Sequence, residues 1–185
     1  MAAIGLIGLE VLLPHRAPRD NGGVTTSPDA DYKQRLEEIA GTHLIPDPAQ
    51  KADAVLRPHI RDRIMRWVRG PKVLEMGAGE LMWTQGIVES FGHSSIVNGS
   101  GSLLKNAQAV YGDKITCYES LFEEFLPPDG IRFHTVIATH VLEHVNNPVA
   151  VLQHARKWLA PGGRIIVAVP NVTSLHRRLG VKWAY

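Results

Sequence analysis

The chain has 185 residues, of which 44% are hydrophobic and 21% are charged, the composition of an ordinary globular protein. Its formal net charge of +2 is too small to indicate nucleic-acid binding, so we expect no nucleic-acid partner. Cys117 is the single cysteine, which excludes an internal disulfide and favours a reducing, cytoplasmic location.

Residues 1–30 are predicted to be an apolar N-terminus followed by a flexible linker. The stretch MAAIGLIGLEVLLPH lacks a basic start and contains Glu10, which argues against a signal peptide. It is also too short to cross a bilayer, so we expect no membrane partner. Residues 14–30 are rich in Pro, Gly, Asp and Thr, as linkers are.

Residues 31–70 are predicted to form a helical extension, because apolar residues recur there at the spacing of a helical face. Gly70-Pro71 ends this region, so the main domain is predicted to span residues 71–185.

From Lys72 onward, β-branched runs alternate with windows of helical periodicity. This alternation predicts an α/β fold, a Rossmann-like doubly wound parallel sheet with helices on both faces. One predicted helix starts at Ser102 and stops at Gly112, and another spans 148–160. The predicted strands are 72–76, 94–98, 114–118, 134–139 and 164–169.

Ligands bind at the carboxyl ends of the strands in such sheets, and glycine or polar residues stand at those ends here. The glycines would let the backbone approach a ligand closely. The residues are Glu75, Gly77, Ala78 and Gly79 for the first strand, Asn98, Gly99 and Ser100 for the second, Glu119 and Ser120 for the third, and Thr139 and His140 for the fourth.

The glycine loop does not fit a dinucleotide well. Met82 stands where a pyrophosphate-binding loop has a small residue, and Asn98 stands where an acidic residue binds the ribose of NAD. We weigh three candidate functions for this chain. The poor fit of the loop makes an NAD-dependent dehydrogenase the third, after the two that are described below.

At these motifs the chain resembles the class I S-adenosylmethionine-dependent methyltransferases, over about residues 71–182. VLEMGAGE is similar to the family's cofactor loop, HTVIATHVLEHVNNP to its fourth-strand motif and WLAPGGRIIVAVPN to its fifth strand. The resemblance implies S-adenosyl-L-methionine as the cofactor and a small-molecule acceptor, with the N-terminal helices helping to cover the acceptor site.

The resemblance also implies roles for individual residues. His140 would be the catalytic base, near the reacting methyl group. The cofactor-binding residues would be Glu75, Gly77, Ala78, Gly79, Asn98, Gly99, Ser100, Glu119, Ser120 and Thr139, and the substrate side would include His144, Asn171, His176 and Arg177.

Three residues depart from the family's pattern. Leu81 stands at a common glycine, Asn98 at the usual Asp or Glu, and His134 at the usual Asp. Asn98 keeps one acceptor oxygen but loses the charge, so we expect donor binding to be weaker by about ten-fold. The first candidate function is methyl transfer to a small molecule. The three departures favour the second, in which the chain is a non-catalytic relative that serves as a binding or scaffold subunit.

The family's sheet continues with a helix and two closing strands, which the 16 residues after Val169 are too few to supply. We therefore expect a shortened sheet whose fifth strand is an exposed edge, and a homodimer or aggregation through that edge.

Residues 140–144, HVLEH, also match the H-x-x-E-H pattern of a class of zinc proteases. That pattern needs both histidines on one helix, whereas His140 is predicted to lie at a strand end. No Asp or Glu follows Glu143 to act as a further ligand. We therefore expect no metal site.

Overall fold

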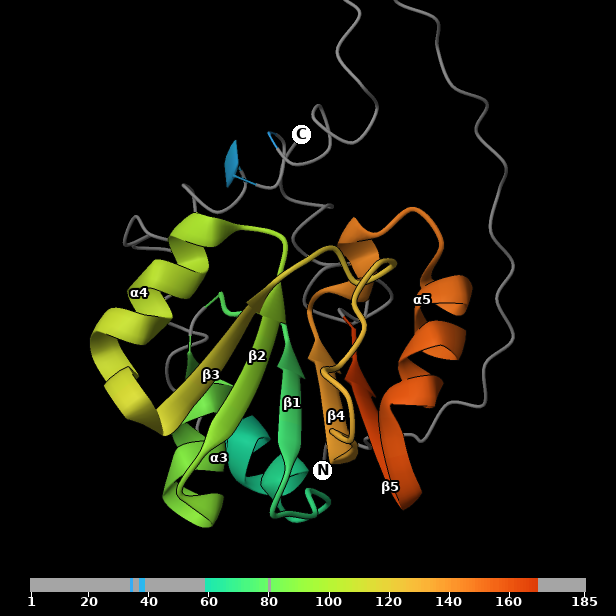
Figure 1. The fold of residues 1–185 in the computed structure, drawn as a ribbon. Helices are drawn as coiled ribbons and strands as arrows, with labels where there is room; N and C mark the ends of the chain where they lie inside the picture. Colours follow the sequence, from blue (N-terminus) through green and yellow to red (C-terminus); the bar gives the residue numbers. More distant parts are fainter. Residues whose placement is uncertain (1–33, 35–36, 39–58, 80, 170–185) are drawn as a thin grey trace, which may run out of the picture.

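The computed structural model describes residues 34, 37, 38, 59–79 and 81–169. This part of the chain contains one sheet of five parallel strands in the order β3-β2-β1-β4-β5 (Figure 1). The predicted Rossmann-like α/β fold is therefore confirmed. The strands are β1 (Val73–Met76), β2 (Ser94–Asn98), β3 (Ile115–Glu119), β4 (Phe133–Thr139) and β5 (Leu159–Ala168).

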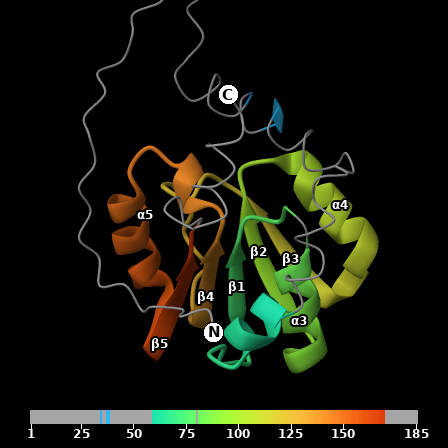
Figure 2. The ribbon, with the colours of Figure 1, turned by 180° about the vertical axis from the view of Figure 1, so that it is seen from behind.

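Helices cover both faces of this sheet (Figures 1 and 2). Because successive strand residues point to opposite faces, Ile96 packs with α4 whereas Val97 belongs to the cluster that includes α5. Helix α3 and the helical residues 59–65 lie on the α4 side, around Val73 and Ile137. The helices are α3 (Met82–Phe91), α4 (Gly101–Tyr111) and α5 (Pro148–Ala155), with short 3₁₀ turns η2 (Gly112–Lys114), η3 (Leu142–His144) and η4 (Arg156–Trp158).

The ends of α4 correct one sequence-based boundary. The helix begins at Gly101, and Ser100 caps it by accepting a hydrogen bond from the Leu103 N–H at 3.3 Å, so the predicted start at Ser102 was wrong. Ser100 and Ser102 are equally suited to capping by composition, and the backbone decides between them. The predicted stop at Gly112 is confirmed.

The strict alternation of strand and helix was wrong between β3 and β4. Residues 120–132 contain no α-helix, only two turns. In the first the Leu121 carbonyl accepts the N–H groups of Glu124 and Phe125, and in the second the Pro128 carbonyl accepts the Ile131 N–H. Two adjacent prolines, Pro127 and Pro128, explain the difference, because proline lacks an N–H and blocks helix continuation.

The boundaries before the fifth strand were also wrong. Helix α5 ends at Ala155 and β5 begins at Leu159, five residues before the predicted start. The glycines predicted to stop a helix instead form an irregularity within β5, where Phe133 pairs with Leu159 but Thr135 pairs with Arg164. A Cβ on Gly163 would lie 2.8 Å from the Ala160 carbonyl oxygen, so this position requires glycine.

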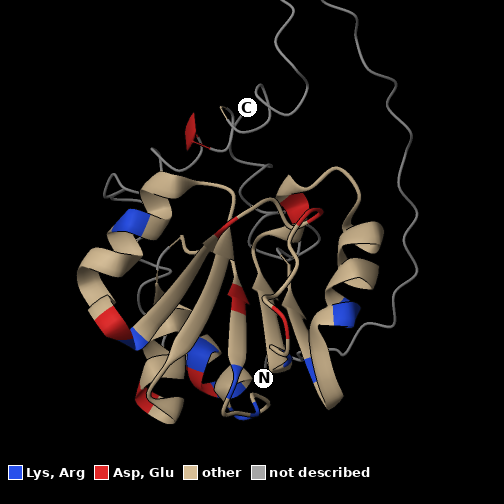
Figure 3. Ribbon diagram, viewed as in Figure 1, with Lys and Arg blue, Asp and Glu red and all other residues tan. Residues whose placement is uncertain are grey.

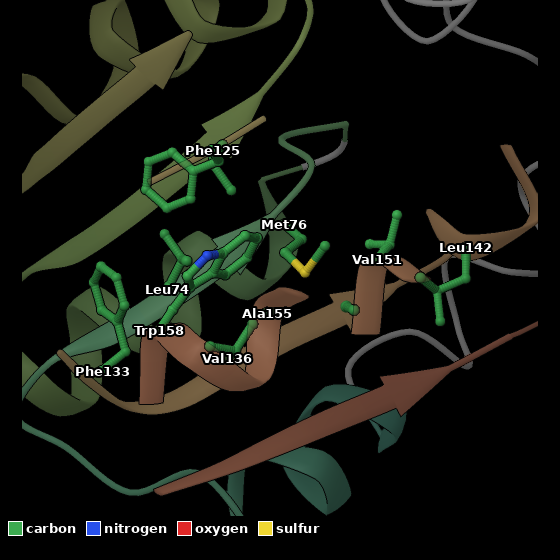
Figure 4. Packing of buried hydrophobic residues seen from close by; sticks show 11 residues of the cluster. Leu74, Met76, Phe125, Phe133, Val136, Leu142, Val151, Ala155 and Trp158 are labelled. Atoms are coloured by element: carbon green, nitrogen blue, oxygen red, sulfur yellow. The ribbon is translucent and has the colours of Figure 1, made fainter. Parts of the chain in front are cut away.

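The largest core cluster lies between the sheet and α5 (Figure 4). Trp158 is 1% exposed and meets Phe125 edge-on, with ring centroids 5.0 Å apart. Phe125 comes from the irregular segment 120–132, so Trp158 fixes that segment against the sheet. This aromatic contact replaces the helix that the alternation had predicted.

Among the described residues, β5 is the outermost strand on its side of the sheet, and Val167 is 43% exposed. The predicted dimer or aggregate through this strand stays a prediction. None of the helices in the described part of the chain is long and apolar enough to cross a membrane.

Replacing Trp158 should unfold the protein far more easily than replacing an exposed tryptophan. Trp158→Ala removes a buried aromatic ring and should lower the free energy of unfolding by about 3–5 kcal/mol. The matched control is Trp67→Ala, because Trp67 is 61% exposed, and its effect should stay within about 0.5 kcal/mol. Urea unfolding of both variants measures the difference. Equal losses would show that Trp158 does not hold the core together.

Candidate functional site

The ends of β1 to β4 meet at one edge of the sheet, toward which the arrowheads point in Figure 1. Three backbone hydrogen bonds join the residues that follow β1, β3 and β4 to neighbouring strands. Gly77 N donates to Val97 O at 2.9 Å, Ser120 N to Asn98 O at 3.1 Å, and His140 N to Ala168 O at 2.9 Å. The edge brings together the predicted residues Glu75, Gly77, Ala78, Gly79, Asn98, Gly99, Ser100, Glu119, Ser120, Thr139 and His140.

The two glycines of the loop after β1 serve different purposes. Gly77 has φ +85°, and a Cβ there would lie 2.5 Å from Val141 Cγ1, so the fold itself demands glycine. At Gly79, no atom of the described residues lies within 4 Å of an added Cβ. Gly79 is therefore the loop position whose open side suits a bound molecule.

Leu81 begins α3 in the left-handed region, with φ 57° and ψ 10°. A branched residue in this conformation costs about 1–2 kcal/mol. The backbone at this position therefore favours glycine. The side chain packs against the cluster that contains Ile96 and Leu103, which offsets part of the cost.

Glu75 is a buried carboxyl group beneath the loop, 3% exposed. Thr84 Oγ1, on α3, donates a hydrogen bond to Glu75 Oε2 at 2.6 Å. Burial raises the pKa of Glu75 to about 8, and the bond from Thr84 offsets part of this rise. Glu75 is therefore mostly protonated at neutral pH. Its predicted contact with the donor stays a prediction, and sequence reasoning missed Thr84.

Asn98 ends β2 and shapes the turn into α4. Its Oδ1 accepts the Ser100 N–H at 2.8 Å, and the residue is 8% exposed. The side-chain oxygen therefore already holds a backbone group. This local bond gives the amide oxygen a structural role at the position where the family usually has a carboxylate.

Two carboxylates from other segments reach the first turn of α4. A Cβ on Gly101 would lie 3.0 Å from Glu119 Oε2, so the absence of a side chain there makes room for Glu119. Ser102 Oγ donates to Glu37 Oε2 at 2.5 Å, and the Ser102 N–H points to Glu37 Oε1 at 3.5 Å. The Ser102 hydroxyl lowers the pKa of Glu37, which is therefore ionised at neutral pH. Sequence reasoning missed Glu37, which lies 65 residues from its partner.

His140 follows β4 in the left-handed conformation, with φ 55°, and its side chain is exposed. Its Nδ1 lies 3.6 Å from Glu143 Oε1 on the η3 turn. A non-glycine residue in this conformation is strained, and such strain is common at functional sites.

The pattern HVLEH does not form a single helix, because His140 follows a strand and His144 ends the short η3 turn. His144 is exposed. Within residues 59–79 and 81–169, as in the three described residues before them, no group of three His, Cys, Asp or Glu is placed to hold a metal ion.

The remaining predicted positions divide into two kinds. His134 Nδ1 faces the Lys72 N–H at 3.3 Å, far from the carboxyl edge, so this departure from the family's pattern has a local structural role. Asn171, His176 and Arg177 lie outside the described residues.

Comparisons with known proteins point to one family. A family model described as a methyltransferase domain matches residues 32–185. A ubiquinone biosynthesis O-methyltransferase of Xylella fastidiosa (strain 9a5c) is 26% identical over 133 residues, which are 69% of this chain and 54% of that protein. The mitochondrial ubiquinone biosynthesis O-methyltransferase of Rattus norvegicus is 27% identical over 139 residues, which are 67% of this chain and 40% of that protein. The chain thus spans about half the length of the curated relatives it matches.

Solved structures show the same fold. The N-methyltransferase NodS from Bradyrhizobium japonicum WM9, in complex with S-adenosyl-L-homocysteine, has a TM-score of 0.58 at 14% identity and covers 74% of this chain and 71% of its own. DhpI in its S-adenosyl-L-homocysteine complex has a TM-score of 0.57 at 21% identity, with 77% and 68% covered. At these identities the likeness shows the fold alone.

The raised pKa of Glu75 makes stability depend on pH. Its protonated form is favoured by folding, so this contribution is complete below the ordinary pKa of 4.5 and is lost as the pH rises through about 8. Glu75→Gln keeps a neutral group of similar size. The variant should match the wild type near pH 4.5 and exceed its free energy of unfolding by about 2–4 kcal/mol near pH 8.

Urea unfolding at a series of pH values measures this difference. Glu89→Gln, at an exposed position on α3, is the control and should show no such trend. A difference between Glu75→Gln and the wild type that stays constant with pH would mean that Glu75 is ionised in the folded protein.

Proposed function

The chain belongs to the class I S-adenosylmethionine-dependent methyltransferase family, and we propose that it transfers a methyl group from S-adenosyl-L-methionine to a small-molecule acceptor. The observation that carries the proposal is the open side of Gly79, beside the hydrogen-bonded ends of the neighbouring strands. The family's donor has methionine and adenosine parts but no phosphate, so its loop needs close backbone approach and not anion binding.

The residues of the edge fit such a donor. Gly79 offers the open backbone, and buried Ala78 supports the loop from below. Glu119 and Glu37 supply acceptor oxygens near the first turn of α4, where ribose and adenine groups need partners. Glu75 is protonated at neutral pH, so the loop covers a neutral carboxyl group and not a buried charge.

Methyl transfer needs little acid or base chemistry from the protein. Bound S-adenosyl-L-methionine supplies a methyl group that its sulfonium already activates. The protein's part is to hold the two reactants in line and to exclude water. In our proposal His140 takes the proton from the acceptor, and Glu143, 3.6 Å from its Nδ1, orients the ring.

The chemical group that accepts the methyl is proposed from the relatives. The curated relatives are named as O-methyltransferases of ubiquinone biosynthesis, which supports a hydroxyl group as the acceptor. A hydroxyl acceptor gives a nearby base a purpose, because it must lose a proton. This assignment rests on relatives of which the chain spans about half.

A non-catalytic relative that binds the donor as a scaffold subunit is the alternative. The observations that favour it are the strained backbone of Leu81 and the Asn98 oxygen that a backbone N–H already occupies. Both would weaken donor binding, and neither bears on the acceptor. Binding without turnover would favour this alternative.

Gly79→Val tests the donor site. The wild type should bind S-adenosyl-L-methionine and S-adenosyl-L-homocysteine in calorimetry, and should not bind NAD. The variant should remain folded, because none of the described residues has an atom within 4 Å of the added Cβ. It should bind at least about ten-fold more weakly, because the valine fills the donor's space.

Ala109→Val, at an exposed position near the end of α4, is the control and should bind like the wild type. Unchanged affinity in folded Gly79→Val would remove the loop from the site. A wild type that binds neither S-adenosyl compound would contradict the proposed function.

A matched pair of histidines tests the base. Transfer of a radiolabelled methyl group is measured on a panel of small molecules that carry hydroxyl or amine groups. His140→Gln should lower kcat by about 10²–10⁴-fold and leave donor affinity unchanged. His93→Gln should behave like the wild type, since His93 is also exposed but precedes β2, at the opposite edge of the sheet. Equal losses in both variants would contradict the assignment to His140.

A further inference from the structure

The structure raises the question of which group accepts the ribose hydroxyls of the donor. The family's usual carboxylate is absent at position 98, and Asn98 Oδ1 already accepts the Ser100 N–H at 2.8 Å. The resemblance places Glu119 beside the adenine. A carboxylate for the ribose must therefore come from another part of the chain.

Glu37 is a carboxylate that reaches the first turn of α4, two residues beyond the Asn98–Ser100 turn. It belongs to the part before the sheet, and the short helical piece at residues 37–38 lies above the start of α4 in Figures 1 and 2. In Figure 3 this piece has the colour of acidic residues and lies beyond the carboxyl edge of the sheet. Ser102 is its partner, through the 2.5 Å bond from the hydroxyl and the 3.5 Å approach of the N–H.

Glu37 is joined to the first turn of α4 by a directional chain of hydrogen bonds. The Leu103 N–H donates to Ser100 Oγ at 3.3 Å, and Ser100 Oγ lies 2.9 Å from Ser102 Oγ. Because Ser102 donates its hydroxyl proton to Glu37, Ser100 must be the donor in the bond between the two serines. Every donor in this chain thus points toward the Glu37 carboxylate.

The carboxylate retains capacity for a ligand. Its two oxygens offer about four acceptor sites, and the side chain is exposed, so a ligand can reach it. The Ser102 hydroxyl lowers the pKa of Glu37, so the group is charged and accepts strong hydrogen bonds. An exposed carboxylate with two oxygens matches two neighbouring hydroxyl groups.

We propose that Glu37 binds the ribose hydroxyls of the donor, in the role that a carboxylate at position 98 has elsewhere in the family. This inference rests on the proposed function. It assigns part of the donor site to the N-terminal part of the chain, whereas a purely structural Glu37 would cap α4 and affect stability alone.

Glu37→Gln in the full-length chain separates these two roles. The variant keeps the size of the side chain and removes the charge, and it should bind S-adenosyl-L-homocysteine about ten-fold more weakly than the wild type. Glu38→Gln is the matched control, because Glu38 is the next residue, is exposed and accepts from Gln34 at 3.2 Å. Its affinity should stay within about two-fold of the wild type.

A ligand without one ribose hydroxyl group makes the test specific. With 2′-deoxy-S-adenosyl-L-homocysteine, the wild type and Glu37→Gln should differ by about two-fold or less, because the hydroxyl and the carboxylate act as a pair. Asn98→Asp in the Glu37→Gln background should recover most of the affinity for S-adenosyl-L-homocysteine, because it returns a carboxylate to the usual position. Melting temperatures of the same samples show that all variants are folded.

Each remaining outcome overturns the inference. An equal loss for both ligands in Glu37→Gln would mean that Glu37 only holds the segment in place. Unchanged affinity in folded Glu37→Gln would remove Glu37 from the site. If Glu37→Gln fails to fold, Ser102→Ala replaces it, and wild-type affinity in that variant would overturn the inference. A wild type that binds neither ligand would overturn the proposed function and this inference with it.

Discussion

The parallel pairing of β1 with strands on both sides is the constraint on which the rest of the structure depends. β1 has four residues, all buried, and it pairs with β2 through Met76 and Val97 and with β4 through Met76 and Ala138. This pairing sets the level at which three neighbouring strands end. The loop after β1, the turn into α4 and the strained His140 therefore meet at one edge, although they are far apart in the sequence. A shift of β1 by one residue would also move Glu75 to the opposite face.

The same strand couples the loop to the candidate base. Gly77 lies against Val141, the residue after His140, so the conformations of the two strand ends depend on each other. Beneath them, the bond from Thr84 to Glu75 ties α3 to β1 and leaves a neutral group under the loop. A charged carboxylate at this depth would lack the partners that burial requires. The steric fit of Gly77 against Val141 and the buried hydrogen bond from Thr84 to Glu75 therefore hold these two strand ends in place.

The sequence predicted what depends on local pattern and missed what depends on distant contacts. The fold, the core of all five strands and the Gly112 helix stop follow from periodicity, glycine and the resemblance. The start of β5 was wrong because Gly162 and Gly163 form an irregularity within a strand, which composition does not distinguish from a helix stop. Thr84 and Glu37 carry no motif, and their relevance appears only when α3 and the N-terminal part meet the sheet edge.

The three departures from the family's pattern have a common physical explanation. Leu81 combines a left-handed backbone with a side chain that packs in the core, Asn98 accepts a backbone N–H in its turn, and His134 faces the N–H of Lys72. Each substituted side chain therefore supports local structure. A site that uses position 98 in this way must take its negative charge from elsewhere, and the first turn of α4 has two carboxylates from other segments within reach. Loss of a family residue is therefore weak evidence for loss of function when the fold supplies the same chemical group from another part of the chain.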